Sequence, residues 1–168
     1  MPAFPEPTTP AADRGEVFVR YLDYFRATLL ERVAGLPEPA AGRSVLPSGW
    51  TPLGLLKHLR YVELRWLEWG FEGRAVAEPW GDRGEDGWFV APDESRDALS
   101  ADLLAQGAIT RAVVGRHALD AVGAPGPRWD GAEPPTLERV LFHLVQEYAR
   151  HVGHIDIVAE LEGGPPGE

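Results

Sequence analysis

Four side chains that can bind a metal or move a proton lie close together near the C-terminus. They are His143, Glu147, His151 and His154, and they include three of the five histidines of the chain. A helix advances about 100° per residue, which places all four within roughly 80° of one face. Imidazole and carboxylate groups are ligands for zinc and similar divalent metals. The spacing therefore predicts a metal or acid–base site on this face.

The apolar residues around this run indicate which of the four side chains point inward. Apolar residues from Leu137 to Val158 repeat at helical spacing, and their mean direction lies closest to Glu147 and His151. His143 and His154 fall nearer the edge of the apolar face. An uncompensated polar group inside such a face is costly, so Glu147 and His151 are the better candidates for ligands. A hydrogen-bonded structural role is the alternative for any one histidine taken alone.

A second predicted helix supplies another imidazole. His58 borders an apolar and aromatic stripe that includes Leu55 and Trp66. Together with Glu147 and His151 it makes three protein ligands and one open position, which is the arrangement of catalytic zinc. The ligand types favour Zn²⁺, with Ni²⁺, Fe²⁺ or Mn²⁺ as alternatives.

Four long amphipathic segments must position these residues. Apolar residues at three-to-four spacing predict helices over about 13–34, 51–71, 95–122 and 136–161. Asp13 and Thr51 are N-cap residue types, and the third helix begins near Asp93 or Ser95. No strand pattern is found beyond short runs such as residues 88–91.

The sequence predicts an all-α protein, a four-helix bundle with long connections between helices one and two and between helices two and three. Long connections in a small domain are often functional. The second one contains Trp80, Trp88 and Phe89, which must either pack over the bundle or line a pocket.

One domain accounts for the 168 residues. We expect the bundle to span residues 13–162. Residues 1–12 are rich in proline, threonine and alanine, and residues 163–168 are rich in glycine and proline. Both segments are expected to be flexible tails.

The composition excludes several functions. The chain has no cysteine, which rules out disulfides, thiolate metal sites and a cysteine nucleophile, so a thiol would have to come from outside. The net charge of −10 argues against a nucleic-acid partner, because binding to phosphates needs clustered lysine and arginine. There is no signal-peptide pattern and no run of about 18 apolar residues. We therefore expect a cytoplasmic protein without a membrane partner.

Two motifs resemble a known family. The run WTPLGLLKHL at residues 50–59, followed by EYARHVGHID at residues 147–156, resembles the DinB-like (YfiT-like) superfamily of metal-binding four-helix bundles. The resemblance spans residues 13–162. It is closest to the branch that contains mycothiol-dependent maleylpyruvate isomerase and related mycothiol or bacillithiol S-transferases.

This resemblance implies that His58, Glu147 and His151 are the zinc ligands and that the protein forms a homodimer. Many relatives have histidine at the position of Glu147 and glutamine at the position of His154. The glutamate points toward the thiol-transferase branch.

The activity implied is that of a transferase or isomerase-like enzyme that activates a low-molecular-weight thiol, such as mycothiol, for attack on a small electrophile. A zinc ion with an open position would bind the thiol and stabilise its thiolate at neutral pH. His154 would be a proton shuttle or a hydrogen-bond partner of a ligand, or a structural histidine at the rim. Arg150 and Trp66 are candidates for contacting the thiol or the substrate. The alternative is that Arg150 is a solvated surface residue and that Trp66 belongs to the core.

Two other functions fit the same residues. A metal-dependent hydrolase would use the three ligands to hold a metal-bound hydroxide. A non-enzymatic stress-response bundle that binds a metal or a small molecule would have a degenerate site or a structural metal. In that case His143 or His154 would be a fourth ligand. His117 lies away from both motifs and is expected to be structural.

Overall fold

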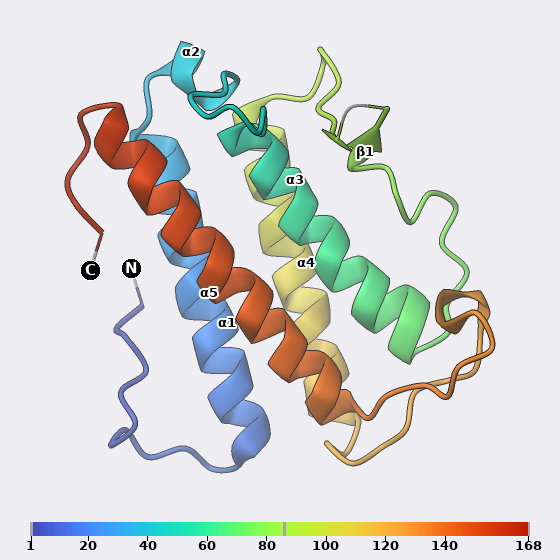
Figure 1. Cartoon of the computed structure of the whole chain (residues 1–168). Helices are drawn as coiled ribbons and strands as arrows, with labels where there is room; N and C mark the ends of the chain where they lie inside the picture. The colour runs from blue at the N-terminus through green and yellow to red at the C-terminus, as the bar shows by residue number, and fades with distance from the viewer. Residues whose placement is uncertain (1, 86, 168) are drawn as a thin grey trace.

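The computed structural model describes residues 2–85 and 87–167, and its long helices form a four-helix bundle (Figure 1). The long helices are α1 (Arg14–Gly35), α3 (Pro52–Glu63) with its π-helical continuation η1 (Leu64–Phe71), α4 (Arg96–Arg116) and α5 (Leu137–Leu161). The short elements are α2 (Glu38–Ala41), the 3-10 turn η2 (Pro127–Trp129), and the antiparallel strands β1 (Arg83–Gly84) and β2 (Gly87–Trp88). The predicted all-α bundle is confirmed.

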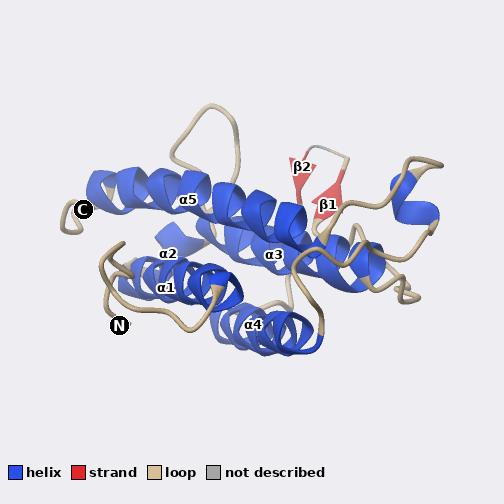
Figure 2. Cartoon of the chain, turned by 90° about the horizontal axis from the view of Figure 1, so that it is seen from below, coloured by secondary structure: helices blue, strands red, loops and turns tan. Residues whose placement is uncertain are grey.

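The order of the helices explains the long connection at residues 72–95. α1 packs against α4 and α5, and α3 packs against the same two helices. Figure 1 shows α1 and α5 running in one direction and α3 and α4 in the other. Because α3 and α4 run in the same direction, the chain must return along the bundle between them. Figure 2 shows the β1–β2 hairpin of this connection beside α3.

Side-chain caps begin the helices where the residue types predict them. Asp13 Oδ1 accepts a hydrogen bond from the backbone N–H of Glu16 at 2.9 Å. Thr51 and Ser95 cap α3 and α4 in the same way. These bonds satisfy N–H groups that have no partner within the helix. The third helix thus begins after Ser95 and not after Asp93.

The predicted end of the third helix near Val122 is wrong, because α4 ends at Arg116. The chain that follows it bonds to the start of α5. The backbone N–H of Leu137 donates to the carbonyl of Ala121 at 3.0 Å, and Val122 forms a β-bridge with Thr136. The backbone N–H and C=O groups of this segment therefore find their hydrogen-bond partners at the start of α5 and not in a continuation of α4.

The short elements are not predicted by periodicity. α2 and each strand of the hairpin are only two to four residues long, which is too short for an apolar repeat to be recognised. Their positions are set by contacts with α3.

The terminal segments can be placed only in part. Met1 and Glu168 lie outside the described residues, as does Asp86. The ring of Phe4 meets Tyr21 and Tyr24 of α1 edge-on, at centroid distances of 5.9 and 5.1 Å. That residues 1–12 and 163–168 are flexible tails outside a domain at residues 13–162 stays a prediction.

Aliphatic side chains from all four long helices fill the core. Members that are almost completely buried include Leu22, Leu29, Val33, Leu55, Leu59, Leu103, Val113, Leu141, Leu144 and Ile155. Each such side chain contributes about 1.5–3 kcal/mol by its burial. Within the described residues, no helix is both long and apolar enough to cross a membrane.

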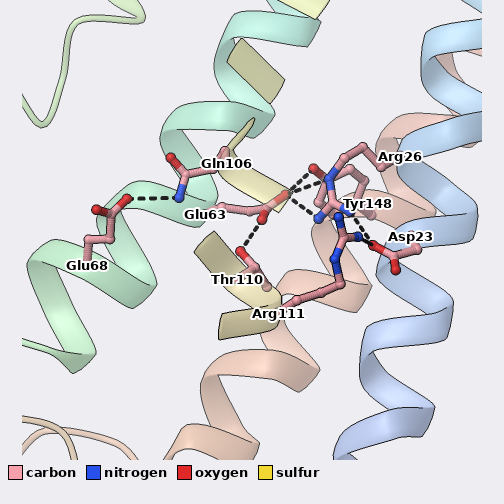
Figure 3. Close-up of polar contacts among 8 residues, drawn as sticks. All are labelled: Asp23, Arg26, Glu63, Glu68, Gln106, Thr110, Arg111 and Tyr148. Atoms are coloured by element: carbon pink, nitrogen blue, oxygen red, sulfur yellow. Dashed lines mark hydrogen bonds and ion pairs between the residues drawn. The ribbon is translucent and has the colours of Figure 1, made fainter. Parts of the chain in front are cut away.

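One polar network is buried in the same core (Figure 3). Glu63, whose exposure is 0 %, accepts hydrogen bonds at Oε1 from Arg26 Nη2 at 2.8 Å and from the Tyr148 hydroxyl. Its Oε2 accepts a hydrogen bond from the Thr110 hydroxyl. α1, α3, α4 and α5 each supply one member, so the network fixes the register of the helices that carry the candidate site.

Candidate metal centre

Three of the side chains predicted to bind metal come together between α3 and α5. His58, Glu147 and His151 each offer a ligand atom, and these atoms lie within 4.8 Å of one another. Glu147 Oε2 is 3.9 Å from His58 Nε2 and 3.4 Å from His151 Nε2. Two ligands about 2.0–2.1 Å from a tetrahedral zinc ion are themselves about 3.4 Å apart. The donors therefore fit one shared ion.

The burial of the three side chains is uneven, and this gives the centre an open side. The side chains of His58 and His151 are 8 % and 10 % exposed, whereas Glu147 is 28 % exposed. The imidazoles are shielded by the core, and solvent reaches the centre beside the carboxylate. An external ligand would enter from that side.

The hairpin in the connection between α3 and α4 covers the imidazoles. The Trp88 ring on β2 stacks on His58, with a centroid distance of 4.2 Å and an interplanar angle of 19°. It meets His151 edge-on at 5.4 Å. These contacts hold both imidazole rings and keep water from one face of His58. Of the loop aromatics, Trp88 is thus the one that lines the centre.

Sequence reasoning missed Asp82, a buried aspartate in the same connection. Its Oδ2 lies 3.0 Å from His58 Nδ1, and its oxygens accept hydrogen bonds from Arg65 Nη1 and Nη2 at 2.6 and 3.1 Å. When Nδ1–H donates to Asp82, Nε2 of His58 presents its lone pair toward the centre. A metal-bound histidine generally needs such a partner, and this need is the one signal that could have pointed to Asp82.

The charge state of Asp82 suits this role. Burial raises the pKa of Asp82, but the hydrogen bonds from His58 and Arg65 outweigh it and hold that pKa below its usual range. The side chain is therefore a carboxylate at neutral pH. A carboxylate partner also increases the basicity of the imidazole that it orients.

Replacing Asp82 by asparagine is expected to weaken zinc binding by about 10- to 100-fold, because the outer partner of a ligand histidine is worth that much affinity. Competition with a chromophoric chelator measures the change. Asp156→Asn is the matched control, since Asp156 is also an ion-paired carboxylate, with Arg32 Nε 2.7 Å away, and is 18 % exposed. Wild-type affinity in Asp82→Asn would show that His58 needs no such partner.

Comparison with known families agrees with this arrangement. The family model "Mycothiol-S-transferase" matches residues 17–164. The chain belongs to the mycothiol S-transferase family. The match covers α1 from residue 17 onward, the other three long helices, the hairpin and the three clustered side chains, so the resemblance to DinB-like proteins is confirmed.

A solved structure shares the fold of this mycothiol S-transferase family member. It is YfiT from Bacillus subtilis, described as a probable metal-dependent hydrolase with an unusual four-helix bundle topology. The TM-score is 0.64 at 17 % identity, over 96 % of this chain and 95 % of that chain. At this identity the likeness concerns the fold. No curated protein matches the chain significantly in sequence.

His143 lies beside the clustered carboxylate but outside the ligand group. Its Nε2 is 3.6 Å from Glu147 Oε1. The nearby imidazoles of His151 and then His58 hold the pKa of Glu147 far below its usual range, so this side chain is anionic at neutral pH. Burial lowers the pKa of His143. In this family member a neutral imidazole therefore stands next to the centre and can accept a proton.

His154 lies beside His151, and the sequence predicts a supporting or structural role for it. Its ring centroid is 5.4 Å from that of His151 and 6.2 Å from that of Trp50. Burial, His151 and Arg150 lower the pKa of His154. Arg150 itself is exposed, and its contact with a thiol or substrate stays a prediction.

Trp66, the last candidate site residue from the sequence, lies outside the ligand group, as does His117, which the sequence predicts to be structural. Trp66 packs against His143, with a centroid distance of 4.3 Å. His117 Nε2 lies 3.2 Å from Glu72 Oε1, and its ring meets Phe71 edge-on. The contacts of His117 are those of a structural residue that holds the end of α4 against η1.

Proposed function

We propose that the protein is a zinc-dependent transferase that joins a low-molecular-weight thiol, such as mycothiol, to a small electrophile. Family membership and the His/Glu/His cluster support a metal-dependent enzyme of the DinB-like group. The observation that carries the proposal further is the open side of the centre. Among the described residues, neither His143 nor His154 joins the ligand group. A structural zinc takes four protein ligands, whereas a catalytic one leaves a position free.

His58, Glu147 and His151 would hold the ion in this proposal. A zinc ion bound there would lower the pKa of a coordinated thiol, so that its sulfur is a thiolate at neutral pH. The protein keeps the donors in place through Asp82 and Trp88. The absence of cysteine from the chain means that no internal thiol competes for the ion or reacts with the electrophile.

A neutral histidine must receive the proton that the thiol loses. His143 is the nearer candidate, because its Nε2 is 3.6 Å from Glu147 at the solvent-facing side of the centre. His154, for which the sequence leaves a proton shuttle as one of the alternative roles, is the second. Replacing each by glutamine and comparing the pH profiles of turnover would separate them, because only the proton acceptor should alter the acidic limb.

The cobalt-substituted protein is expected to gain a thiolate-to-metal absorption band when a thiol such as N-acetylcysteine is added. The reason is that an open coordination position can take the sulfur. Absorption spectra with and without the thiol measure it. The His151→Ala protein, treated in the same way, is the control. A wild-type spectrum that the thiol leaves unchanged would indicate a closed, structural site, and with it the non-enzymatic alternative.

A metal-dependent hydrolase is the second candidate, and the shared fold with YfiT favours it. In that reaction water takes the place of the thiol and the same neutral histidine accepts its proton. The two functions differ in their dependence on thiol. Turnover of a bimane electrophile only when thiol is added supports the transferase. Thiol-independent hydrolysis of a p-nitrophenyl ester supports the hydrolase.

The proposal also includes a homodimer in the cytoplasm, without a nucleic-acid or membrane partner. Exposed apolar side chains on α5 offer a surface for a second copy, with Phe142, Ile157 and Leu161 each more than half exposed. Light scattering after gel filtration would give the mass in solution.

A further inference from the structure

A group of aromatic rings and one guanidinium lies beside the metal centre but outside its ligands. Arg128, in the η2 turn, places its guanidinium carbon 4.4 Å from the ring centroid of Trp66, 5.9 Å from that of Trp69 and 5.5 Å from that of Trp129. We call these four residues the tryptophan corner. Two of its rings come from η1 and the other two members from η2.

The tryptophan corner is closely packed. A Cβ atom added at Gly70 would lie 2.9 Å from the Trp129 ring, so the close approach of η2 to η1 requires glycine there. Trp129 Nε1 donates a hydrogen bond to the carbonyl of Ala124 at 2.9 Å. These two contacts fix the ring against which the Arg128 guanidinium lies.

Arg128 is half-buried, and it lacks the anionic partner that the buried arginines have. Arg26 and Arg65 pair with Glu63 and Asp82 at 2.8 and 2.6 Å. No described residue accepts a hydrogen bond from Arg128 or forms an ion pair with it, and its Nε is buried without a partner. A partly desolvated charge without a counterion is costly. This is notable in a chain with 26 acidic and 16 basic residues.

The tryptophan corner is joined to the metal centre through one histidine. Trp66 contacts the His143 ring at a centroid distance of 4.3 Å, and His143 Nε2 lies 3.6 Å from Glu147 Oε1. A small molecule held at Arg128 would therefore stand next to a reactant bound beside Glu147.

We propose that the tryptophan corner binds the carboxylate of the electrophile, so that the substrates are small acids with an apolar or unsaturated group next to the carboxylate. The planar guanidinium offers paired N–H groups that match a carboxylate, and the tryptophan faces suit the adjoining group. This substrate class rests on the proposed transferase function. The thiol must reach the ion itself, which leaves the position beyond His143 for the second reactant.

Tryptophan fluorescence tests the proposal with benzoate as the probe and benzamide as its neutral counterpart. Chelator-treated protein is expected to bind benzoate saturably and more tightly than benzamide. Arg128→Gln should weaken benzoate binding by about 10- to 100-fold, which is the value of hydrogen bonds to a charged group. Arg128→Lys keeps the charge but not the paired N–H groups, so its affinity for benzoate should lie between those of the wild type and Arg128→Gln.

Arg83→Gln is the matched control, because Arg83 also lies over a tryptophan, with its guanidinium 5.1 Å from the Trp80 centroid, but on the hairpin. Its benzoate affinity should equal that of the wild type. Circular dichroism of each variant checks that the bundle is folded. Equal affinities for benzoate and benzamide, or unchanged benzoate binding in Arg128→Gln and Arg128→Lys, would overturn the proposal.

Two further measurements separate this proposal from the others. Because the titration uses metal-free protein, benzoate binding in a protein that takes up no zinc would sink the proposed function and leave the carboxylate site standing. Competition with a thiol that has no carboxylate identifies which reactant occupies the tryptophan corner. If the methyl ester of N-acetylcysteine displaces benzoate, the corner holds the thiol and the assignment to the electrophile is wrong.

Discussion

Replacing His151 by alanine is expected to remove zinc from the protein while leaving the bundle folded. His58 and Glu147 alone would give two ligands, where zinc sites in enzymes use three. The loss of affinity should exceed the roughly 10- to 100-fold effect of an outer partner. Metal analysis of protein purified without added metal should fall from about one zinc per chain to background.

Variants of the other histidines make this result specific. His117→Ala is the control, because His117 bonds to Glu72 and has no contact with the cluster. It should retain the zinc content of the wild type. His58→Ala and Glu147→Gln should lose metal as His151→Ala does. Equal zinc content in His151→Ala and wild type would mean that the ion, if present, is bound elsewhere.

The fold follows from the sequence wherever local signals decide it. The starts of α1, α3 and α4 are recognisable because Asp13, Thr51 and Ser95 are residues whose side chains cap a helix. The end of α4 is not, because the chain beyond Arg116 takes its hydrogen bonds from the start of α5. That pairing joins residues 12 to 19 positions apart in the sequence, and no local pattern contains it.

The residues of the candidate site also fall into those that local sequence signals predict and those that depend on tertiary packing. Glu147 and His151 are one helical turn apart, and His58 lies on the face of its helix that meets them, so periodicity alone predicts the group. Asp82 and Arg128 lie in connections between helices, whose paths depend on tertiary packing. The aromatic content of the loop at residues 72–95 indicates a functional segment, but not that an aspartate in it would orient a ligand.

Replacing Glu63 by alanine is expected to destabilise the protein by about 3–5 kcal/mol, which is the cost of breaking a buried ion pair by removing one partner. Arg26, only 3 % exposed, would keep its charge with Asp23 as its remaining partner. The hydroxyls of Tyr148 and Thr110 would lose their acceptor. At about 2–4 °C per kcal/mol for a domain of this size, the midpoint of thermal unfolding should fall by roughly 6–20 °C.

An exposed ion pair supplies the comparison. Arg43→Ala removes a 2.7 Å pair with Glu162 in which the arginine side chain is 61 % exposed, and such pairs contribute about 0–1 kcal/mol. Urea unfolding of both variants gives the two free energies. If Glu63→Ala and Arg43→Ala unfold at the same urea concentration, the network does not hold the helices together.

A double variant distinguishes the value of the network from the cost of leaving it incomplete. Arg26→Met combined with Glu63→Leu removes both buried charges and fills their volume with apolar groups, an exchange that is often neutral or stabilising. We expect it to be more stable than Glu63→Ala, because the guanidinium no longer lies in the core without its carboxylate. Full recovery is not expected, because Tyr148 and Thr110 still lack an acceptor. A double variant that is less stable than Glu63→Ala would show that the two charges make a large net contribution to the free energy of unfolding. The register of all four helices would then depend on these charges.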